Sequence, residues 1–291
     1  MLDLHFLTSN IMGKGTDNVK YREMEVNEGV YIPEYEIEYP EDDSSKKIAG
    51  VRYNGTDLDL DENYPYLDNS FRYKLHHFFN RTLLTLVVKP LNRIRYGVKI
   101  NGNLRQYRKT FPEGAMTVCN HVYRWDLVCV LNALGFKNVW FPIYGDHMRS
   151  KDAWFMRFVG GIPVPESKAG MRPFNEAFDK LHERGEWMHV FPEAASWRFY
   201  TPIRSFKKGA FTMAYKYNMP VIPCVITYRP RTGIFRLFDK ANIPLITINI
   251  GTPILPDTTK PRKDEVGRLL NEAHAQMVRM AGIRKNPWPA E

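Results

Sequence analysis

The sequence predicts an α/β fold, in which a largely parallel or mixed sheet is flanked by helices and preceded by an N-terminal amphipathic helical segment. Two observations predict it. Short apolar runs of strand length alternate with longer stretches of helical character over residues 98–281, an order typical of a sheet covered on both faces. Hydrophobic residues make up 44% of the 291 residues, enough for the core of one large domain with an added segment, or of two domains.

The strands are predicted from apolar runs bounded by glycine, proline or polar residues. They fall at residues 98–101, 115–119, 139–143, 162–164, 186–191, 221–226 and 245–250. The helices are predicted between them, with Gly185 and Asn218 as end signals for two. They fall at residues 127–131, 152–159, 172–184, 208–217 and 264–281.

Residues 1–68 are predicted to form an acidic N-terminal extension, because they hold 6 Lys+Arg against 16 Asp+Glu, a net charge of −10. A weak alternation over residues 31–39 predicts a half-exposed strand, and residues 57–62 read as a solvated loop. The extension either folds back on the rest of the chain or is loosely held, and its residues suggest no chemistry.

The remainder of the chain is strongly basic, with 35 Lys+Arg against 16 Asp+Glu and a net charge of +19. Such a body implies an anionic partner, which can be nucleic acid, an anionic membrane surface or a phosphorylated substrate. Cys119, Cys129 and Cys224 lie in apolar runs without metal-ligand spacing, so we expect a reducing compartment and no metal. Asp3 and His5 interrupt the first apolar residues, so no signal peptide is expected, and no apolar run reaches the length of a transmembrane helix.

Residues 69–97 are predicted to form a basic amphipathic helix, with large apolar residues recurring every three or four positions over residues 71–94 and Arg and Lys between them. Pro90 is expected to kink or end this helix near Val88. Two interpretations stay open: the apolar stripe docks on a membrane interface, with the cations meeting anionic headgroups, or it faces an ordinary core.

The candidate catalytic stretch is Asn120-His121-Val122-Tyr123-Arg124-Trp125-Asp126, which lies where a predicted strand hands over to a helix. Within one helix, His121 and Asp126 would be about 140° apart around the axis and could not meet. If His121 is in the turn and Asp126 in the first helical turn, the carboxylate can orient the imidazole and leave its other nitrogen free as a base. The alternative is a satisfied histidine beside an aspartate that only caps the helix.

Four blocks in order resemble the glycerophospholipid acyltransferases, and most closely the 1-acylglycerol-3-phosphate (lysophosphatidic acid) acyltransferases. The resemblance covers about residues 70–255 and makes 98–291 an acyltransferase α/β domain. The blocks are Asn120-His121-x4-Asp126, Gly160-Gly161-Ile162-Pro163-Val164, Phe191-Pro192-Glu193 with the lysine-rich stretch of residues 206–211, and Val221-Ile222-Pro223.

The resemblance implies acyl transfer from a thioester of coenzyme A or acyl carrier protein to a glycerol hydroxyl, with His121 and Asp126 catalytic and no cofactor. The family follows Phe-Pro-Glu with Gly-Thr-Arg, whereas this chain has Ala194-Ala195-Ser196-Trp197-Arg198, and the second block continues with Pro165-Glu166 rather than an arginine. The expected acceptor-binding residues are therefore the glutamate and glycine of the blocks and the nearest cations: Glu193, Gly161, Arg198, Arg204, Lys168, Arg172, Lys207 and Lys208.

We therefore expect an enzyme at the cytoplasmic face of a membrane, held peripherally or monotopically, whose partners are anionic lipid, a lysophospholipid acceptor and the thioester donor. Glycerol-3-phosphate, another lysophospholipid or an acylated amino acid stays open as an alternative acceptor. A non-catalytic binder of anionic lipid or nucleic acid is the other alternative, although no nucleic-acid motif is present and nucleic acid is not an expected partner.

Overall fold

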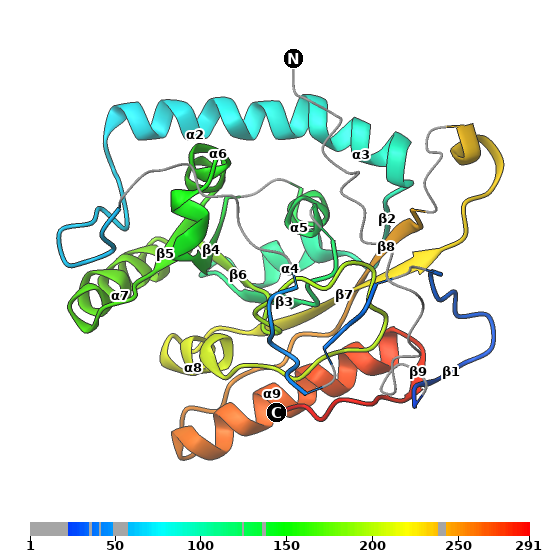
Figure 1. Cartoon of the computed structure of the whole chain (residues 1–291). Helices are drawn as coiled ribbons and strands as arrows, with labels where there is room; N and C mark the ends of the chain where they lie inside the picture. The colour runs from blue at the N-terminus through cyan, green and yellow to red at the C-terminus, as the bar shows by residue number, and fades with distance from the viewer. Residues whose placement is uncertain are drawn as a thin grey trace.

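The fold is a seven-stranded mixed sheet with helices on both faces, seen in a computed structural model (Figure 1). The structure describes residues 23–34, 37–40, 42–48, 58–123, 125–135, 138–237 and 243–291. The strand order is β2-β8-β7-β3-β6-β4-β5, and every neighbouring pair is parallel except β7 with β8. The predicted α/β fold with a largely parallel or mixed sheet is confirmed.

The strands of this sheet agree with the predicted runs to within a few residues. They are β2 (Lys99–Asn101), β3 (Met116–Cys119), β4 (Val139–Tyr144), β5 (Gly161–Val164), β6 (Trp187–Val190), β7 (Val221–Arg229) and β8 (Leu245–Ile250). A separate antiparallel pair joins β1 (Glu25–Val26) to β9 (Ile283–Lys285).

The helices also follow the predicted order. They are α2 (Phe71–Leu83), the π-helix η1 (Leu84–Val88), α3 (Lys89–Tyr96), α4 (Leu104–Thr110), α5 (Asp126–Ala133), the 3-10 helix η2 (Gly145–Arg149), α6 (Ala153–Phe158), α7 (Lys168–Glu183), α8 (Gly209–Lys216), the 3-10 helix η3 (Gly233–Leu237) and α9 (Arg262–Met280). Helix α7 begins four residues before its predicted start, because the Ser167 side chain caps it by accepting from the backbone N–H of Gly170.

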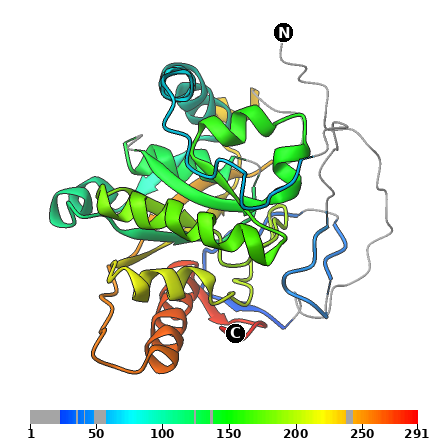
Figure 2. The same ribbon diagram turned by 90° about the vertical axis from the view of Figure 1, so that its left-hand side faces the viewer.

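Alternating side chains of the strands face two apolar layers. Met116 and Val118 of β3 point into a core closed by α7, α8 and α9, whereas Cys119 points into a core closed by η1, α3, α4 and α5. Figure 2 shows α8 and α9, in yellow and orange, on one side of the sheet, with the cyan rod of α2 and α3 seen end-on at the other. Since the sheet is buried on both faces, its polar chemistry gathers at the ends of the strands.

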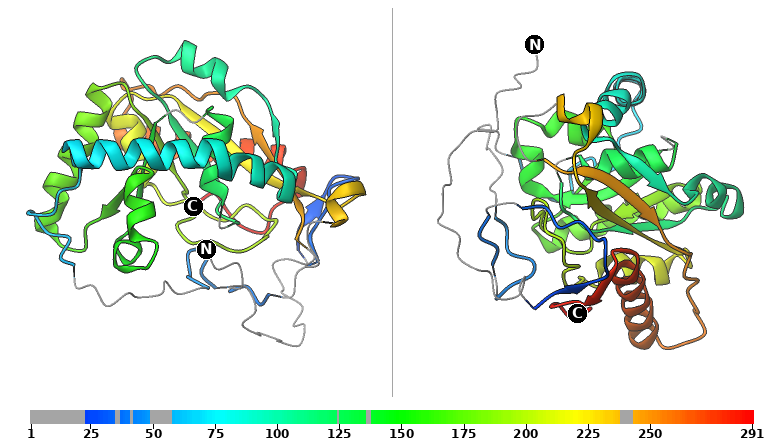
Figure 3. Two further views of the ribbon diagram at one scale, coloured as in Figure 1. Left: turned by 90° about the horizontal axis from the view of Figure 1, so that it is seen from above. Right: turned by 90° about the vertical axis from the view of Figure 1, so that its right-hand side faces the viewer.

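Helices α2 and α3 form one long rod, because a π-helical turn joins them instead of a break (Figure 3, left). The expectation that Pro90 ends or kinks the helix near Val88 is wrong in its position. The α-helical pattern already changes at Leu84, and the Lys89 N–H reaches back to the Leu84 carbonyl. Pro90 then falls in the first turn of α3, where its missing N–H costs nothing.

The rod carries its apolar stripe outward. Tyr73, Asn80, Arg81 and Asn92 are buried on the inner side, whereas the large apolar side chains of the stripe are exposed: Phe71, Leu75, Phe78, Phe79, Leu83, Leu86, Val87, Leu91 and Ile94. The stripe therefore does not pack on the sheet. None of the described helices combines the length and apolar character needed to cross a bilayer.

The described part of the extension lies against the α/β body, where the strand prediction is wrong and the prediction of a solvated loop holds for its charged residues but not for Leu60. The described residues of 31–39 form no strand; instead Tyr39 is buried, with its ring 4.6 Å from that of Tyr200. Within the predicted loop of residues 57–62, of which residue 57 lies outside the described part, Leu60 is buried and its carbonyl accepts from the Tyr66 hydroxyl at 2.8 Å. Single aromatic and leucine side chains hold this segment against the body. They do not recur at regular spacing, so the sequence pattern could not indicate these contacts.

Candidate active site

The candidate catalytic turn, residues 120–126, begins where β3 ends, at a residue whose side chain extends the pairing of the sheet. The buried Asn120 side chain donates to the Ile226 carbonyl at 3.1 Å and accepts from the Ile226 N–H at 2.8 Å. These two bonds continue the parallel pairing of β3 with β7 for one more position after the Cys119–Cys224 pair. The next residue, His121, is therefore held rigidly just beyond the carboxyl end of the sheet.

His121 and Asp126 meet as their spacing predicts. Nδ1 of His121 lies 2.6 Å from Oδ2 of Asp126, which is the first residue of α5 and is 1% exposed. The same carboxylate accepts backbone N–H groups of Val122, Tyr123 and Leu127 at 3.1, 3.3 and 2.8 Å. The N-cap position of α5 is Trp125, so Asp126 is not the cap residue of the helix; its carboxylate accepts the Leu127 N–H in the first turn and also orients the histidine.

The imidazole has a defined tautomer and a free second nitrogen. A carboxylate only accepts hydrogen bonds, so Nδ1 carries the proton and Nε2 carries the lone pair. No described residue donates to Nε2, and the His121 side chain is 25% exposed. The ring stacks on Phe191, with the centroids 4.3 Å apart and the planes 16° apart. This arrangement can take a proton from a hydroxyl group that reaches Nε2.

Two further histidines lie close enough for their charges to interact with that of His121. His189 of β6 is fully buried, and burial followed by the charge of His121 lowers its pKa to about 3. Burial also lowers the pKa of His147 in η2, with the charges of His121 and Lys47 as the next causes. Both rings are therefore neutral at neutral pH.

A buried ion pair lies beneath the turn. Glu193 follows β6, the strand beside β3, and its Oε2 accepts the His121 N–H at 2.9 Å and an Arg204 Nη2–H at 2.7 Å. Its Oε1 accepts the Arg204 N–H at 2.9 Å, and both side chains are 0% exposed. Arg204 also donates to the His121 carbonyl at 3.3 Å and lies over the Trp197 ring at 4.4 Å. The pair therefore binds both the N–H and the carbonyl group of His121.

The loop after Glu193 closes over the same turn. Trp197 N–H donates to the His121 carbonyl at 2.9 Å, and Phe199 N–H donates to the Val122 carbonyl at 2.8 Å. Ala194 adopts φ = 67°, a left-handed conformation that favours glycine. Position 194 therefore has a backbone conformation that glycine adopts more easily than the alanine found there.

The structure separates the predicted site residues into three groups. His121, Asp126, Glu193 and Arg204 form one connected network, in which the last two are too deeply buried to reach an acceptor in this conformation. Gly161 begins the edge strand β5, where an added Cβ would lie 2.7 Å from the Met156 carbonyl, so packing alone accounts for the glycine.

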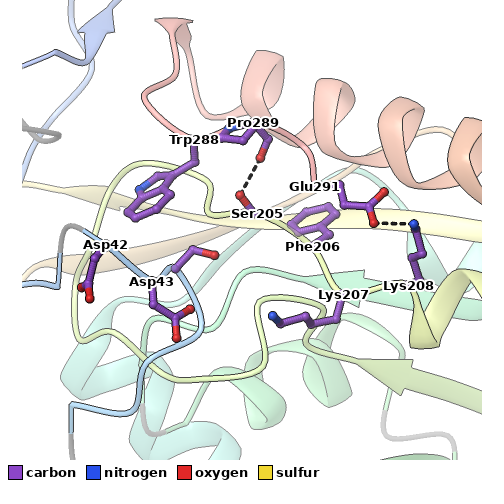
Figure 4. A pocket seen from close by; sticks show the side chains of 10 residues that line it. Asp42, Asp43, Ser205, Phe206, Lys207, Lys208, Trp288, Pro289 and Glu291 are labelled. Carbon is purple, nitrogen blue, oxygen red and sulfur yellow. Dashed lines mark hydrogen bonds and ion pairs between the residues drawn. The ribbon is translucent and has the colours of Figure 1, made fainter.

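The remaining predicted residues are cations outside this network. The guanidinium of Arg198 lies 5.2 Å from the Phe199 ring. Lys168 and Arg172 are exposed in the first turns of α7. Lys207 and Lys208 lie in a pocket of about 580 Å³ that His121 does not line (Figure 4).

That pocket carries charges of both signs. Residues 42–44, 205–208, 288–289 and 291 line it, and Lys208 forms an ion pair with Glu291. Among the described residues, no cluster of three or more His, Cys, Asp or Glu side chains is arranged to hold a metal ion.

Sequence reasoning missed three features of the site. The stacking of Phe191 under His121 could have been suspected, because this residue directly precedes Pro192-Glu193 after a strand. The presence of His147 near the site could also have been predicted. It follows β4, and the carboxyl ends of parallel strands lie at the same edge of a sheet, where β3 and β6 also end. No pattern signalled that residues 42–48 reach the site, because Ser44 and Lys46 contact it through backbone carbonyls.

Comparison with known proteins finds acyltransferases that are similar to part of this chain. The family model Acyltransferase matches residues 98–227. A 1-acyl-sn-glycerol-3-phosphate acyltransferase of Saccharomyces cerevisiae is 28% identical over 135 residues. The chain is therefore similar to acyltransferases over residues 98–227, which make up less than half of its length.

The match with the yeast relative is partial. It covers 43% of this chain and 41% of the yeast protein, so the chain spans about two fifths of that relative's length. Among solved structures, this chain is similar to the 1-acyl-sn-glycerophosphate acyltransferase PlsC of Thermotoga maritima, with a TM-score of 0.46 and 19% identity over 74% of this chain and 84% of that one.

Proposed function

We propose that the protein transfers a fatty acyl group from acyl-CoA or acyl carrier protein to the free hydroxyl of 1-acylglycerol-3-phosphate, giving phosphatidic acid. The observation that carries this proposal is the His121–Asp126 pair, in which a buried carboxylate leaves Nε2 of a partly exposed imidazole free. Residues 98–227, which match the acyltransferase family model, contain both residues, and this supports their assignment to acyl transfer.

His121 acts as the general base in this mechanism. Nε2 takes the proton of the acceptor hydroxyl while its oxygen attacks the thioester carbonyl carbon, and Asp126 stabilises the imidazolium that forms. The resulting tetrahedral intermediate collapses as the C–S bond breaks. The proton on Nε2 passes to the departing sulfur, so that a free thiol and an ester are the products and His121 is regenerated.

The proposal predicts release of free thiol from acyl-CoA that depends on lysophosphatidic acid. His121→Ala and Asp126→Asn should each lower turnover by about 10²–10⁴-fold, the range typical of lost general-base catalysis. His182→Ala, on α7 and stacked on Tyr217, serves as the matched histidine control and should keep turnover. Wild-type turnover in the His121→Ala variant would refute the assignment of the base.

Another acceptor is the second candidate, because both features that the resemblance expects at the acceptor site are altered. Ala194-Ala195-Ser196 stand where the family has Gly-Thr-Arg, and Pro165-Glu166 follow the second block where the family has an arginine. Assaying glycerol-3-phosphate, other lysophospholipids and an acylated amino acid, each with acyl-CoA and acyl carrier protein, identifies the preferred pair. Salt-dependent binding to DNA or anionic lipid without thiol release from any pair would instead favour a non-catalytic binder.

A membrane-docking role for the rod of α2, η1 and α3 is part of this proposal. The rod exposes a continuous apolar stripe while burying polar residues on its inner side, the reverse of a helix that contributes to a core. The η3 loop adds Ile234 and Leu237, 63% and 82% exposed, beside the C-terminal end of α3. Arg231 fastens this loop by donating to the Arg95 carbonyl at 2.8 Å.

The charges on the rod fit an anionic bilayer surface. Arg72, Lys74, Lys89, Arg93 and Arg95 carry positive charge along it, with no Asp or Glu between residues 69 and 97. Apolar side chains at the level of the acyl chains and cations at the level of the headgroups are the two features of an interfacial helix. Docking at the cytoplasmic face would bring the acceptor and the acyl chain to the site from the bilayer.

A further inference from the structure

Residues 42–48, here called the strap, lie beside the catalytic turn although they are more than seventy positions before it in the sequence. The Ser44 carbonyl accepts from Arg204 Nη1 at 2.7 Å, and the Lys46 carbonyl accepts from Trp197 Nε1 at 2.8 Å. Arg204 and Trp197 are the two residues that donate to the His121 carbonyl. The strap is thus fastened at two points to the groups that hold His121.

The fastened strap directs the side chain of Lys47 to the same edge of the sheet as His121. Lys47 Nζ lies 3.1 Å from Asp146 Oδ2 and 4.2 Å from the centroid of the Tyr144 ring. Tyr144 ends β4 and Asp146 follows in η2, while β4 lies next to β6 and β6 next to β3. The charges of Lys47 and His121 both lower the pKa of His147, which lies next to Asp146 in the chain.

An acceptor that bears a phosphate needs a cation close to the base. Only a few bonds separate the phosphate of a glycerol phosphate from the hydroxyl that loses its proton, so both must lie near Nε2 of His121. Arg204 is 0% exposed, and Lys208 is paired with Glu291 in the pocket of Figure 4. Lys47, by contrast, has a side chain that is 46% exposed, and it belongs to a segment outside the region matched by the family model.

We infer that Lys47 binds the phosphate monoester of the acceptor and takes the place of the arginine that the family's third block would supply. The inference rests on the proposed function, whose acceptor it specifies as an anionic one. Asp146 holds the ammonium in the free enzyme, but that pair is half exposed on both sides, 46% and 50%, and such pairs contribute little. A dianionic phosphate can therefore displace Asp146 from Lys47.

The donor is the other possible source of a phosphate. Coenzyme A carries its nucleotide phosphates at the far end of the pantetheine arm, away from the thioester carbon that must lie at His121. The acceptor phosphate is the one that must lie near the base, and we assign Lys47 to it. Measurements with acceptor and donor varied separately distinguish the two sources.

The test compares equilibrium binding of lysophosphatidic acid with that of the 1-monoacylglycerol of the same chain, which lacks the phosphate. Lys47→Met should weaken binding of lysophosphatidic acid about tenfold, the loss of one charge-assisted hydrogen bond, and leave monoacylglycerol binding unchanged. Lys47→Arg should retain most of the affinity. Asp146→Asn should strengthen binding of lysophosphatidic acid, because it removes the competing carboxylate.

Lys46→Met is the matched control, since Lys46 is exposed on the same strap and contacts Trp197 only through its carbonyl. It should leave both affinities unchanged, and the thermal unfolding of all four variants should match that of the wild type. In turnover, Lys47→Met should raise KM for the acceptor and leave KM for acyl-CoA unchanged. A raised KM for acyl-CoA alone would assign Lys47 to the donor and overturn the inference.

Failure of the inference is separable from failure of the proposed function. If Lys47→Met binds lysophosphatidic acid as the wild type does, or loses affinity equally for the phosphate-free lipid, Lys47 does not bind the phosphate. If the wild type binds lysophosphatidic acid through Lys47 but releases no thiol with any donor, the proposed reaction is refuted and the anion site remains. Absence of any preference of the wild type for the phosphorylated lipid would refute the anion site itself.

Discussion

Replacing Arg204 by methionine should destabilise the fold far more than an ordinary substitution near a surface site. The change removes the buried cation and leaves the Glu193 carboxylate with two backbone donors, the N–H groups of His121 and residue 204. Breaking a buried pair by removing one partner costs about 3–5 kcal/mol. The two remaining donors place the expected loss of unfolding free energy near the lower end of that range, at about 3 kcal/mol.

Urea unfolding followed by tryptophan fluorescence measures this loss, and a double-mutant cycle assigns it to the pair. Glu193→Gln alone strands the guanidinium and should also be costly, whereas Glu193→Gln with Arg204→Met removes both charges. The double variant should therefore be more stable than the sum of the single losses predicts, by about 1–3 kcal/mol. Arg204→Met within 1 kcal/mol of the wild type, or strict additivity in the cycle, would refute the account of Glu193 as a buried anchor of the His121 turn.

Three further outcomes are expected. Ala194→Gly should raise the free energy of unfolding by about 0.5–1 kcal/mol, because glycine adopts the left-handed backbone conformation of this position without the steric cost that alanine has. Ala195→Gly is the control and should not raise it, since Ala195 does not have a positive φ. Burial lowers the pKa of His189 to about 3 in the folded protein, so between about pH 6.5 and pH 3 only the unfolded chain binds this proton. The free energy of unfolding should therefore fall by about 1.4 kcal/mol for each pH unit over that range as the pH is lowered. His189→Gln should remove this one-proton contribution to the pH dependence of stability. Phe78→Ser with Leu86→Ser should weaken binding to anionic lipid vesicles at least tenfold without lowering stability, because both side chains are exposed.

Each of these outcomes has a measurement that can contradict it. Equal urea midpoints for the Ala194→Gly variant and the wild type would show that the loop tolerates the left-handed alanine. An unchanged slope of stability against pH for His189→Gln would show that another group takes up the proton. The control for vesicle binding is Leu255→Ser, which removes a similarly exposed side chain between β8 and α9. If this variant weakens vesicle binding as much as the double variant does, the rod is not the docking surface.

The sequence was most informative where the contacts are local. The strand, turn and helix around His121 follow from two short apolar runs, and the meeting of His121 with Asp126 follows from the requirement that one be in the turn and the other in the helix. The same kind of pattern predicted the seven strands, because each is a short buried run. Helix α4 was missed, since Leu104 is its only buried residue, although Asn103 supplies a cap that could have indicated it.

The sequence was least informative where charged residues are buried or where contacts run through the backbone. Glu193 and Arg204 were expected to bind the acceptor on the strength of the family resemblance. Their burial as a pair was not foreseen, because charged side chains are rarely fully buried and no local pattern marks a pair eleven positions apart. The strap was assigned no chemistry for a related reason. Its anchors are the carbonyls of Ser44 and Lys46, and every residue type carries a carbonyl.

The anchoring of Arg204 has a practical consequence for producing this protein in pieces. The region matched by the family model ends at residue 227, within β7, and omits β8, which pairs with both β2 and β7. It also omits α9, which closes one core, and Ser44, whose carbonyl satisfies the buried guanidinium. A fragment cut to residues 98–227 would expose two strand edges and leave a half-built catalytic loop, so the segment recognisable by comparison is smaller than the unit that folds.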